Sequence, residues 1–202
     1  MIRISSAAAL LGSLLGVVSI PTFAQGIIAA DSVTAQALVG RDGNGFSSCG
    51  VRVLATVASM SSGEMYDFSV AVYRKNLMPL IKAGRYDLTK ADIQKGVLPP
   101  AAVPAPSKFL LSSATQDATL EATNIMPAED KGFSLGLADL AKTWLAITAL
   151  ADGENMHLVM RSPKQRWDRV VSFSAKLTEG EAKSLNSCLG SLVKDMEDLQ
   201  KK

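Results

Sequence analysis

Four cations and a tryptophan lie within nine residues near the end of the chain. The members of this segment are Arg161, Lys164, Arg166, Trp167 and Arg169. Guanidinium groups pair with anionic oxygens, and an indole beside them can stack on a sugar or meet an anionic head group. The segment predicts a surface patch for an anionic glycan, a lipid head group or a partner protein. The alternative is a solvated turn in which Trp167 anchors the loop to the core.

The residues needed for the common catalytic sites are sparse. His157 is the only histidine, so any Ser-His-Asp or Cys-His mechanism would have to run through it. It stands between Met156 and Leu158 on an alternating segment, which predicts a strand histidine that faces solvent. One histidine and two cysteines do not suit the common zinc sites, and we expect no metal or cofactor. The acids Glu129-Asp130 and Asp152-Glu154 keep a two-carboxylate hydrolase open as an alternative.

The first 24 residues have the pattern of a signal peptide. Arg3 supplies a positive charge, residues 7–20 form an apolar run, and Ala24 provides a small residue before Gln25. The apolar run is shorter than the ~20 residues that a spanning helix needs. We therefore predict cleavage after Ala24, a periplasmic or secreted location, and a mature chain that does not span a membrane.

The predicted export also bears on the state of the two cysteines, Cys49 and Cys188. In an oxidising compartment a lone pair of cysteines favours a disulfide over reactive thiols. Such a bond would connect the first part of the domain to its last helix. Free or intermolecular thiols are the alternative.

The charge of the chain is close to balanced. It has 21 Lys and Arg against 19 Asp and Glu, a formal net charge of +2. Nucleic-acid binding usually needs a concentrated basic face, so we expect no nucleic-acid partner.

Alternating apolar residues predict a mainly β fold. The strongest pattern is a hairpin, in which residues 51–58 and 66–73 alternate on either side of a Gly-containing loop. Residues 80–88 predict a shorter strand bent around Gly84. Further short strands are expected at 108–112, 118–124, 133–137 and 167–177.

Four segments are less regular. Residues 33–39 alternate like a strand, although Asp31 could instead cap a short helix. Residues 90–95 follow a capping pattern at Thr89 and predict one or two helical turns. The Pro-rich segment 99–106 predicts an extended crossover. Residues 138–151 fit both periods, and the Asp152-Gly153 turn after them favours a strand over 143–150.

The chain closes with a long helix. Thr178 and Glu181 form a capping box, and the apolar residues behind them step by three and four. These residues are Ala182, Leu185, Leu189, Leu192, Met196 and Leu199. Their spacing predicts a helix that packs its apolar face on a sheet, with Cys188 beside that face.

Together these patterns predict a signal peptide (1–24) followed by a single domain (25–202). Its fold is β-sandwich-like or a partly open barrel, with a long C-terminal helix packed on the sheet. The missing catalytic motifs favour a non-catalytic binding or accessory protein of the bacterial cell envelope, with another envelope or secreted protein among its candidate partners. A carrier of a small apolar ligand or lipid is the second hypothesis, and the hydrolase is the third.

Overall fold

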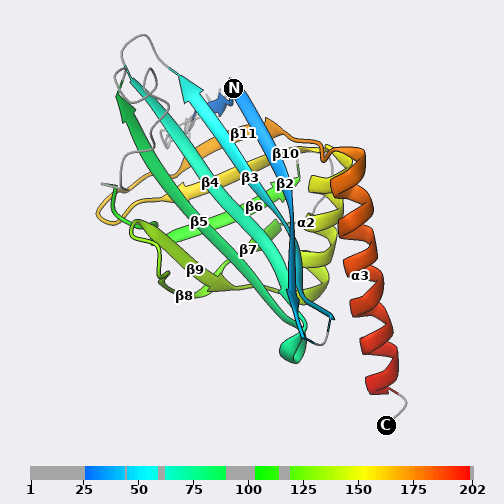
Figure 1. Cartoon of the computed structure of the whole chain (residues 1–202). Coiled ribbons are helices and arrows are strands. Elements are labelled where there is room, and N and C mark those ends of the chain that lie inside the picture. The colour runs from blue at the N-terminus through cyan, green and yellow to red at the C-terminus, as the bar shows by residue number, and fades with distance from the viewer. Residues whose placement is uncertain (1–25, 44, 59–61, 90–102, 114–118, 201–202) are drawn as a thin grey trace, which may run out of the picture.

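Two β-sheets form most of the molecule (Figure 1). The computed structural model describes residues 26–43, 45–58, 62–89, 103–113 and 119–200. The predicted signal peptide, the predicted helical turns at 90–95 and residues 99–102 of the Pro-rich segment lie outside the described residues.

The larger sheet has six strands, and all its neighbours are antiparallel. In spatial order they are β2 (Ser32–Asp42), β3 (Gly45–Ala58), β4 (Ser62–Tyr73), β5 (Met78–Thr89), β9 (Phe133–Leu137) and β8 (Thr123–Pro127). The predicted hairpin is confirmed as β3 and β4, with Ala58 opposite Gly63. A short 3-10 helix, η1 (Lys75–Leu77), joins β4 to β5.

The smaller sheet has five strands. In spatial order they are β1 (Ile27–Ala29), β11 (Arg169–Ser174), β10 (Asn155–Arg161), β6 (Lys108–Ser113) and β7 (Thr119–Glu121). Among the described strands only one pairing is parallel, that of β1 with β11, which brings together strands from opposite ends of the described chain. The strands of the two sheets run in clearly different directions in Figure 1.

At two of the places where the chain changes sheet, consecutive strands pass directly from one sheet to the other. The N–H of Ala30 donates to Ser172 of β11 at 2.9 Å, and the N–H of the next residue, Asp31, donates to Thr56 of β3 at 2.8 Å. The N–H of Ala122 similarly donates to Phe109 of β6, and the following strand, β8, pairs with β9. Strands that change sheet in this way form the corners of a sandwich. The segment predicted as one strand over 118–124 is therefore divided at Ala122.

The core lies between the sheets and is filled by alternate residues of the long strands. Phe68 of β4 and Phe173 of β11 meet across it with their ring centroids 5.2 Å apart. Residues that the hairpin pattern assigned to one face, such as Val53 and Val70, are fully buried. Burial of such a side chain contributes about 1.5–3 kcal/mol, so the two sheets are held mainly by this apolar layer.

The strand expected at 143–150 is wrong, because this segment belongs to the helix α2 (Leu140–Asp152). The carboxylate of Asp139 accepts from the N–H of Lys142 at 2.9 Å, and Gly153 ends the helix in the left-handed region with φ 80°. The Asp152-Gly153 pair is thus a helix C-cap and not a hairpin turn. The helix packs against β4 of one sheet and against β6 and β7 of the other. The buried residues Thr143, Ala146, Ile147 and Leu150 share one side of the helix, but Leu145 on the other side is 50% exposed, so the apolar residues of the segment do not follow one simple helical stripe.

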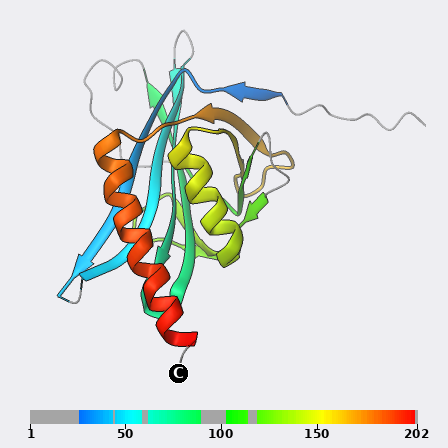
Figure 2. The same ribbon diagram turned by 90° about the vertical axis from the view of Figure 1, so that its right-hand side faces the viewer.

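The C-terminal helix α3 (Glu179–Gln200) confirms the capping box and the buried stripe. Glu181 accepts from the hydroxyl of Thr178 at 2.7 Å, and Leu185, Leu189 and Leu192 are buried. Figure 2 shows α3 running beside the strands of the larger sheet, where it packs on β2 and β3. The predicted fold class, a mainly β sandwich with a C-terminal helix packed on the sheet, is confirmed.

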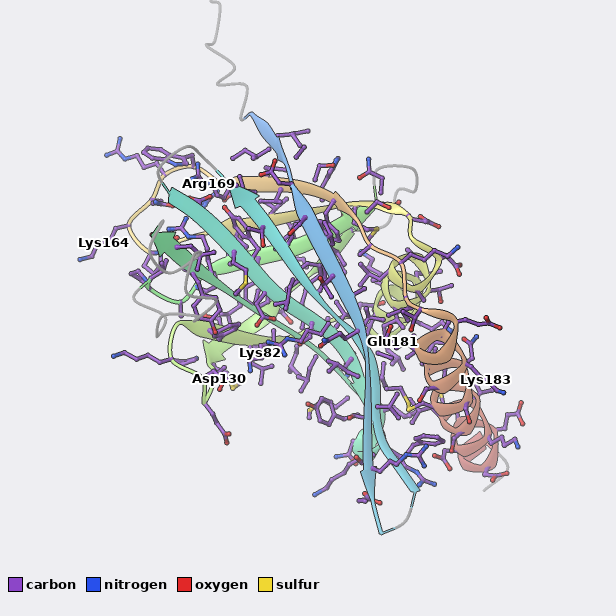
Figure 3. The ribbon with its side chains drawn as sticks, turned by 45° about the horizontal axis from the view of Figure 1, so that its top comes forward. Lys82, Asp130, Lys164, Arg169, Glu181 and Lys183 are labelled. Atoms are coloured by element: carbon purple, nitrogen blue, oxygen red, sulfur yellow. A yellow bond between two sulfur atoms is a disulfide. The ribbon has the colours of Figure 1, made fainter. Side chains whose placement is uncertain are left out.

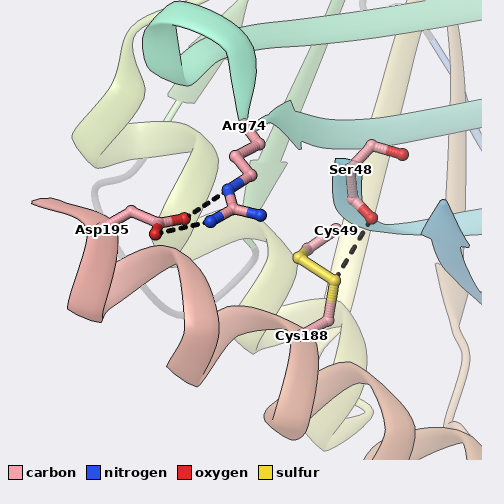
Figure 4. The surroundings of a disulfide bond; sticks show 5 residues. All are labelled: Ser48, Cys49, Arg74, Cys188 and Asp195. Carbon is pink, nitrogen blue, oxygen red and sulfur yellow. Dashed lines mark hydrogen bonds and ion pairs between the residues drawn. A yellow bond between two sulfur atoms is a disulfide. The ribbon is translucent and has the colours of Figure 1, made fainter. Parts of the chain in front are cut away.

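Two connections between α3 and the larger sheet lie close together (Figure 4). The predicted disulfide joins Cys49 of β3 to Cys188, with 5.7 Å between their Cα atoms, and both residues are fully buried. Further along the helix, Asp195 accepts a hydrogen bond from Nη2 of Arg74 at 2.8 Å, and Nε of the same guanidinium lies 2.7 Å from the other carboxylate oxygen. A covalent bond and a bidentate ion pair therefore fix the helix at two points.

No helix among the described residues is long and apolar enough to cross a membrane.

Candidate functional site

The segment from Arg161 to Arg169, called the cationic loop below, connects β10 to β11. Because β10 follows α2 and β11 leads to α3, the loop lies at the far end of these strands from both helices (Figure 1). Figure 3 shows Lys164 and Arg169 at this end of the molecule. The turn is closed by a backbone hydrogen bond from Gln165 to Ser162 at 3.1 Å.

Three of the five predicted patch residues face solvent. Trp167 is 58% exposed, which is far more than a tryptophan that anchors a loop to the core would show. Lys164 and Arg166 are exposed too, and neither forms an ion pair with any residue that the structure describes. Two unneutralised cations thus lie within three residues of an accessible indole.

The other two cations of the segment have partners within the fold. Arg161 donates through Nε to Asp168 at 2.6 Å, and this hydrogen bond raises the pKa of Arg161. Since the two residues stand at opposite ends of the turn, their pairing closes its base. The cations without an ion pair among the described residues are therefore in the middle of the loop and not at its ends.

Arg169 enters a cluster between the two sheets. It donates to Glu64 of β4, and Arg85 of β5 approaches the same carboxylate at 3.6 Å. The hydroxyl of Tyr66 donates to the second oxygen of Glu64 at 2.6 Å. We call Glu64, Tyr66, Arg85 and Arg169 the ion cluster. It joins β11 of the smaller sheet to β4 and β5 of the larger one, directly beneath the cationic loop.

The pKa values in the ion cluster reflect opposing effects. Burial raises the pKa of Glu64, but hydrogen bonds from Arg169 and Tyr66 and the charges of Arg169 and Arg85 outweigh it, so the pKa lies below its usual value. Burial and the hydrogen bond to Glu64 raise the pKa of Tyr66. Glu64 is therefore ionised and Tyr66 is neutral at pH 7. Arg85 also pairs with Asp87, at 3.1 Å, so the two guanidinium groups of the cluster are balanced by two carboxylates.

Sequence reasoning did not identify Glu64 or Arg85 as part of this site. A usable signal was present, because Glu64 continues the buried face formed by Tyr66 and Phe68 in the hairpin. A carboxylate on the buried face of a strand needs a cationic partner. The identity of that partner could not be read from the sequence, since β11 lies about a hundred residues further along the chain.

The other candidates from the sequence are separated in the structure. His157 lies on the outward face of β10 between buried Met156 and Leu158, as the alternation predicts. Asp130 forms an ion pair with Lys82, and Glu154 accepts from the hydroxyl of Ser113 at 3.3 Å. Among the residues that the structure describes, no three His, Cys, Asp or Glu side chains gather as a metal site would require.

Comparison of the chain with protein-family models, with curated proteins and with solved structures finds no match.

Proposed function

We propose that this protein is an exported, non-catalytic binding protein of the bacterial cell envelope, periplasmic or secreted, which holds an anionic partner with its cationic loop. The observation that carries the proposal is the exposed indole of Trp167 beside the unpaired cations of Lys164 and Arg166. An exposed tryptophan flanked by cations has the composition of a contact surface, since Trp and Arg are enriched at binding hot spots.

The base of the loop is already ordered, which lowers the entropy cost of binding. The Arg161–Asp168 pair closes the turn, and the bond of Arg169 to Glu64 attaches it to the core. A partner would then have to immobilise only the exposed side chains, at about 0.5–1.5 kcal/mol each. The remaining attraction would come from the positive charge of Lys164 and Arg166 in the loop.

Export is part of the proposal. The signal-peptide pattern of residues 1–24 and the buried Cys49–Cys188 disulfide both fit an oxidising compartment. In the cytosol such a disulfide would be unusual.

Among the described residues, the hollow beside α2 gives a carrier no support. The hollow between α2 and the smaller sheet, lined by Leu111, Leu120 and Met156 among others, has a volume of about 10 Å³. That is room for a single water molecule and not for a lipid chain. The hydrolase alternative gains no support from Asp130 and Glu154, since each is engaged by a side chain of a different strand.

The test uses the fluorescence of Trp167 as its readout. The chain has two tryptophans, so Trp144→Phe leaves Trp167 as the single reporter. We expect a shift of its emission on addition of heparin, a sulfated glycan, or of vesicles that contain phosphatidylglycerol. The shift should weaken from 0.1 M to 1 M salt as the Debye length falls from ~10 Å to ~3 Å. The response to one probe and not the other distinguishes a glycan from a lipid head group.

The variant Lys164→Ala/Arg166→Ala should reduce the affinity about tenfold or more. The matched control is Lys183→Ala/Lys194→Ala, which removes the same charge from exposed positions of α3. If neither anionic probe binds, native mass spectrometry after incubation with envelope extract should find a bound polypeptide that the loop variant loses. Equal binding by the loop variant and the control, or no bound species in any of these experiments, would overturn the proposal.

A further inference from the structure

A second concave site lies on the outer face of the larger sheet, away from the cationic loop residues. It is a groove of about 380 Å³, within the range of small-molecule sites. Its polar lining comes from three neighbouring strands and from the β8–β9 loop. The polar residues are Arg52, Asp67, Ser69, Lys82, Tyr86 and Asp130.

The register of the strands brings these side chains together. Arg52 of β3 lies opposite Ser69 of β4, which in turn lies opposite Lys82 of β5. Asp67, two residues before Ser69, lies on the same face because side chains alternate along a strand. One row of polar groups thus crosses the middle of the sheet.

Aromatic rings form one wall of the groove. The absence of a side chain at Gly84 makes room for the ring of Phe133, since a Cβ there would lie 2.5 Å from it. The ring of Tyr86 meets Phe133 edge to face, with the centroids 5.6 Å apart, and the amine of Lys82 lies 5.0 Å from the centre of the Phe133 ring. At another part of the lining Tyr73 is 42% exposed.

The charges in the groove balance. Arg52 donates to both oxygens of Asp67, at 2.9 and 2.6 Å, and the side chain of Asp67 is only 7% exposed. Lys82 pairs with Asp130, whose side chain is 65% exposed, and Figure 3 shows these two side chains near one another. Two cations and two carboxylates give no net attraction for an ionic ligand. They do offer hydrogen-bond donors and acceptors side by side.

We propose that this groove binds a neutral, hydroxyl-rich ligand, namely an uncharged saccharide. A sugar hydroxyl can donate to a carboxylate and accept from a guanidinium or ammonium group at once, so alternating charges of opposite sign match its needs. The exposed ring of Tyr73 gives an apolar surface for the C–H groups of the sugar. The proposal does not depend on the cationic loop, because the two sites share no residue.

The experiment is saturation-transfer NMR on the full mature protein with four probes. N-acetylglucosamine and maltotriose are the uncharged probes, and glucuronate and glucosamine are the charged controls. We expect transfer to at least one uncharged probe, at millimolar concentration, and weaker or no transfer to the charged ones. The loop variant Lys164→Ala/Arg166→Ala should retain the signal, which separates this proposal from the function of the loop.

Substitutions in the groove should remove the signal while the fold is kept. Asp130→Asn and Lys82→Met each leave the pair of Arg52 with the almost buried Asp67 intact. We expect each to raise the Kd about tenfold or more, the loss of one charged hydrogen bond. The matched control is Glu121→Gln, which removes an exposed, ion-paired acid from β7 of the other sheet. No transfer to either uncharged probe, a preference for a charged probe, or an unchanged signal in both groove variants would overturn the proposal.

Discussion

Arg169, the first residue of β11, forms an ion pair with Glu64 of β4 and thereby connects the smaller sheet to the larger one beneath the cationic loop. The cations of the loop therefore differ in their surroundings. Arg169 is half-buried and ion-paired, whereas Arg166 is exposed to solvent.

This difference predicts unequal effects on stability. Arg169→Ala leaves a half-buried carboxylate with one partner fewer, and we expect a loss of about 1–3 kcal/mol. Arg166→Ala changes an exposed side chain and should stay within about 0.5 kcal/mol. Denaturant unfolding at pH 7 measures both. Equal, small effects would show that Glu64 does not depend on Arg169.

The lowered pKa of Glu64 predicts that the stability of the fold depends on pH. Its pKa in the folded protein is lowered, so the stabilisation that it provides is complete above its unfolded value of about 4.5 and is lost as the pH falls through the folded pKa. We expect Glu64→Gln to be less stable than wild type at pH 7, with the difference shrinking towards pH 3. Unfolding midpoints measured at several pH values test this. A difference that stays constant with pH would contradict the assignment.

The disulfide should contribute strongly to stability. It closes a loop with a sequence separation of 139 residues, for which the chain-entropy model gives about 4–5 kcal/mol. Cys49→Ala/Cys188→Ala should lower the free energy of unfolding by an amount of this order, and reduced wild type should resemble the variant. As a control, added reductant should not change the free energy of unfolding of the variant. Alkylation of both cysteines in unreduced wild type would rule out the bond.

The N-cap of α2 allows a local test of the corrected element. Asp139→Ala removes the acceptor for the N–H of Lys142 and should cost about 1 kcal/mol, whereas Asp139→Ser should restore most of it. If residues 143–150 formed a strand, Asp139 would cap no helix, and Asp139→Ser would not be more stable than Asp139→Ala. Thermal or denaturant unfolding gives the comparison.

The proposed export predicts a specific mature terminus. Intact-mass measurement on protein recovered from outside the cytoplasm should place the first residue at Gln25. A mass that includes residues 1–24 would contradict cleavage after Ala24.

Patterns within one element were reliable guides to this fold, and patterns that depend on distant partners were not. The β3–β4 hairpin and α3 each bury one face against one layer, so their periods of two and of three to four are clear in the sequence. Helix α2 contacts both sheets, and Thr143, Ala146, Ile147, Ala149 and Leu150 are all buried. These residues share one side of the helix, but the exposed Leu145 continues an alternation with Thr143, Ile147 and Ala149, so the segment resembled a strand. The cap residues Asp139 and Gly153 marked its ends.

The same distinction applies to the sites. The cationic loop was predictable because its residues are contiguous, and the exposure of Trp167 agrees with a surface patch. The groove was not recognised, because its residues come from several elements. Part of the groove could have been predicted from the sequence. Arg52 and Asp67 lie on the polar face of a predicted hairpin, and the hairpin register brings them together. The contribution of Asp130 depends on the later strands β8 and β9, whose place in the sheet no local pattern indicates.

Under the proposed export, the passage of the chain between sheets has a consequence for the order of folding during translocation. Strands β2 to β5 pair with one another in sequence order, so this meander can assemble as soon as residues 32–89 have left the membrane, and β9 adds to β5 later. Strand β1 must wait, since its partner residues in β11 run from Val170 to Ser172. Cys49 waits equally for Cys188. Contacts between such distant segments form slowly. We therefore expect a late intermediate in which β2 to β5 are formed, the first strand is unpaired and Cys49 is still a thiol, open to the oxidants of the compartment.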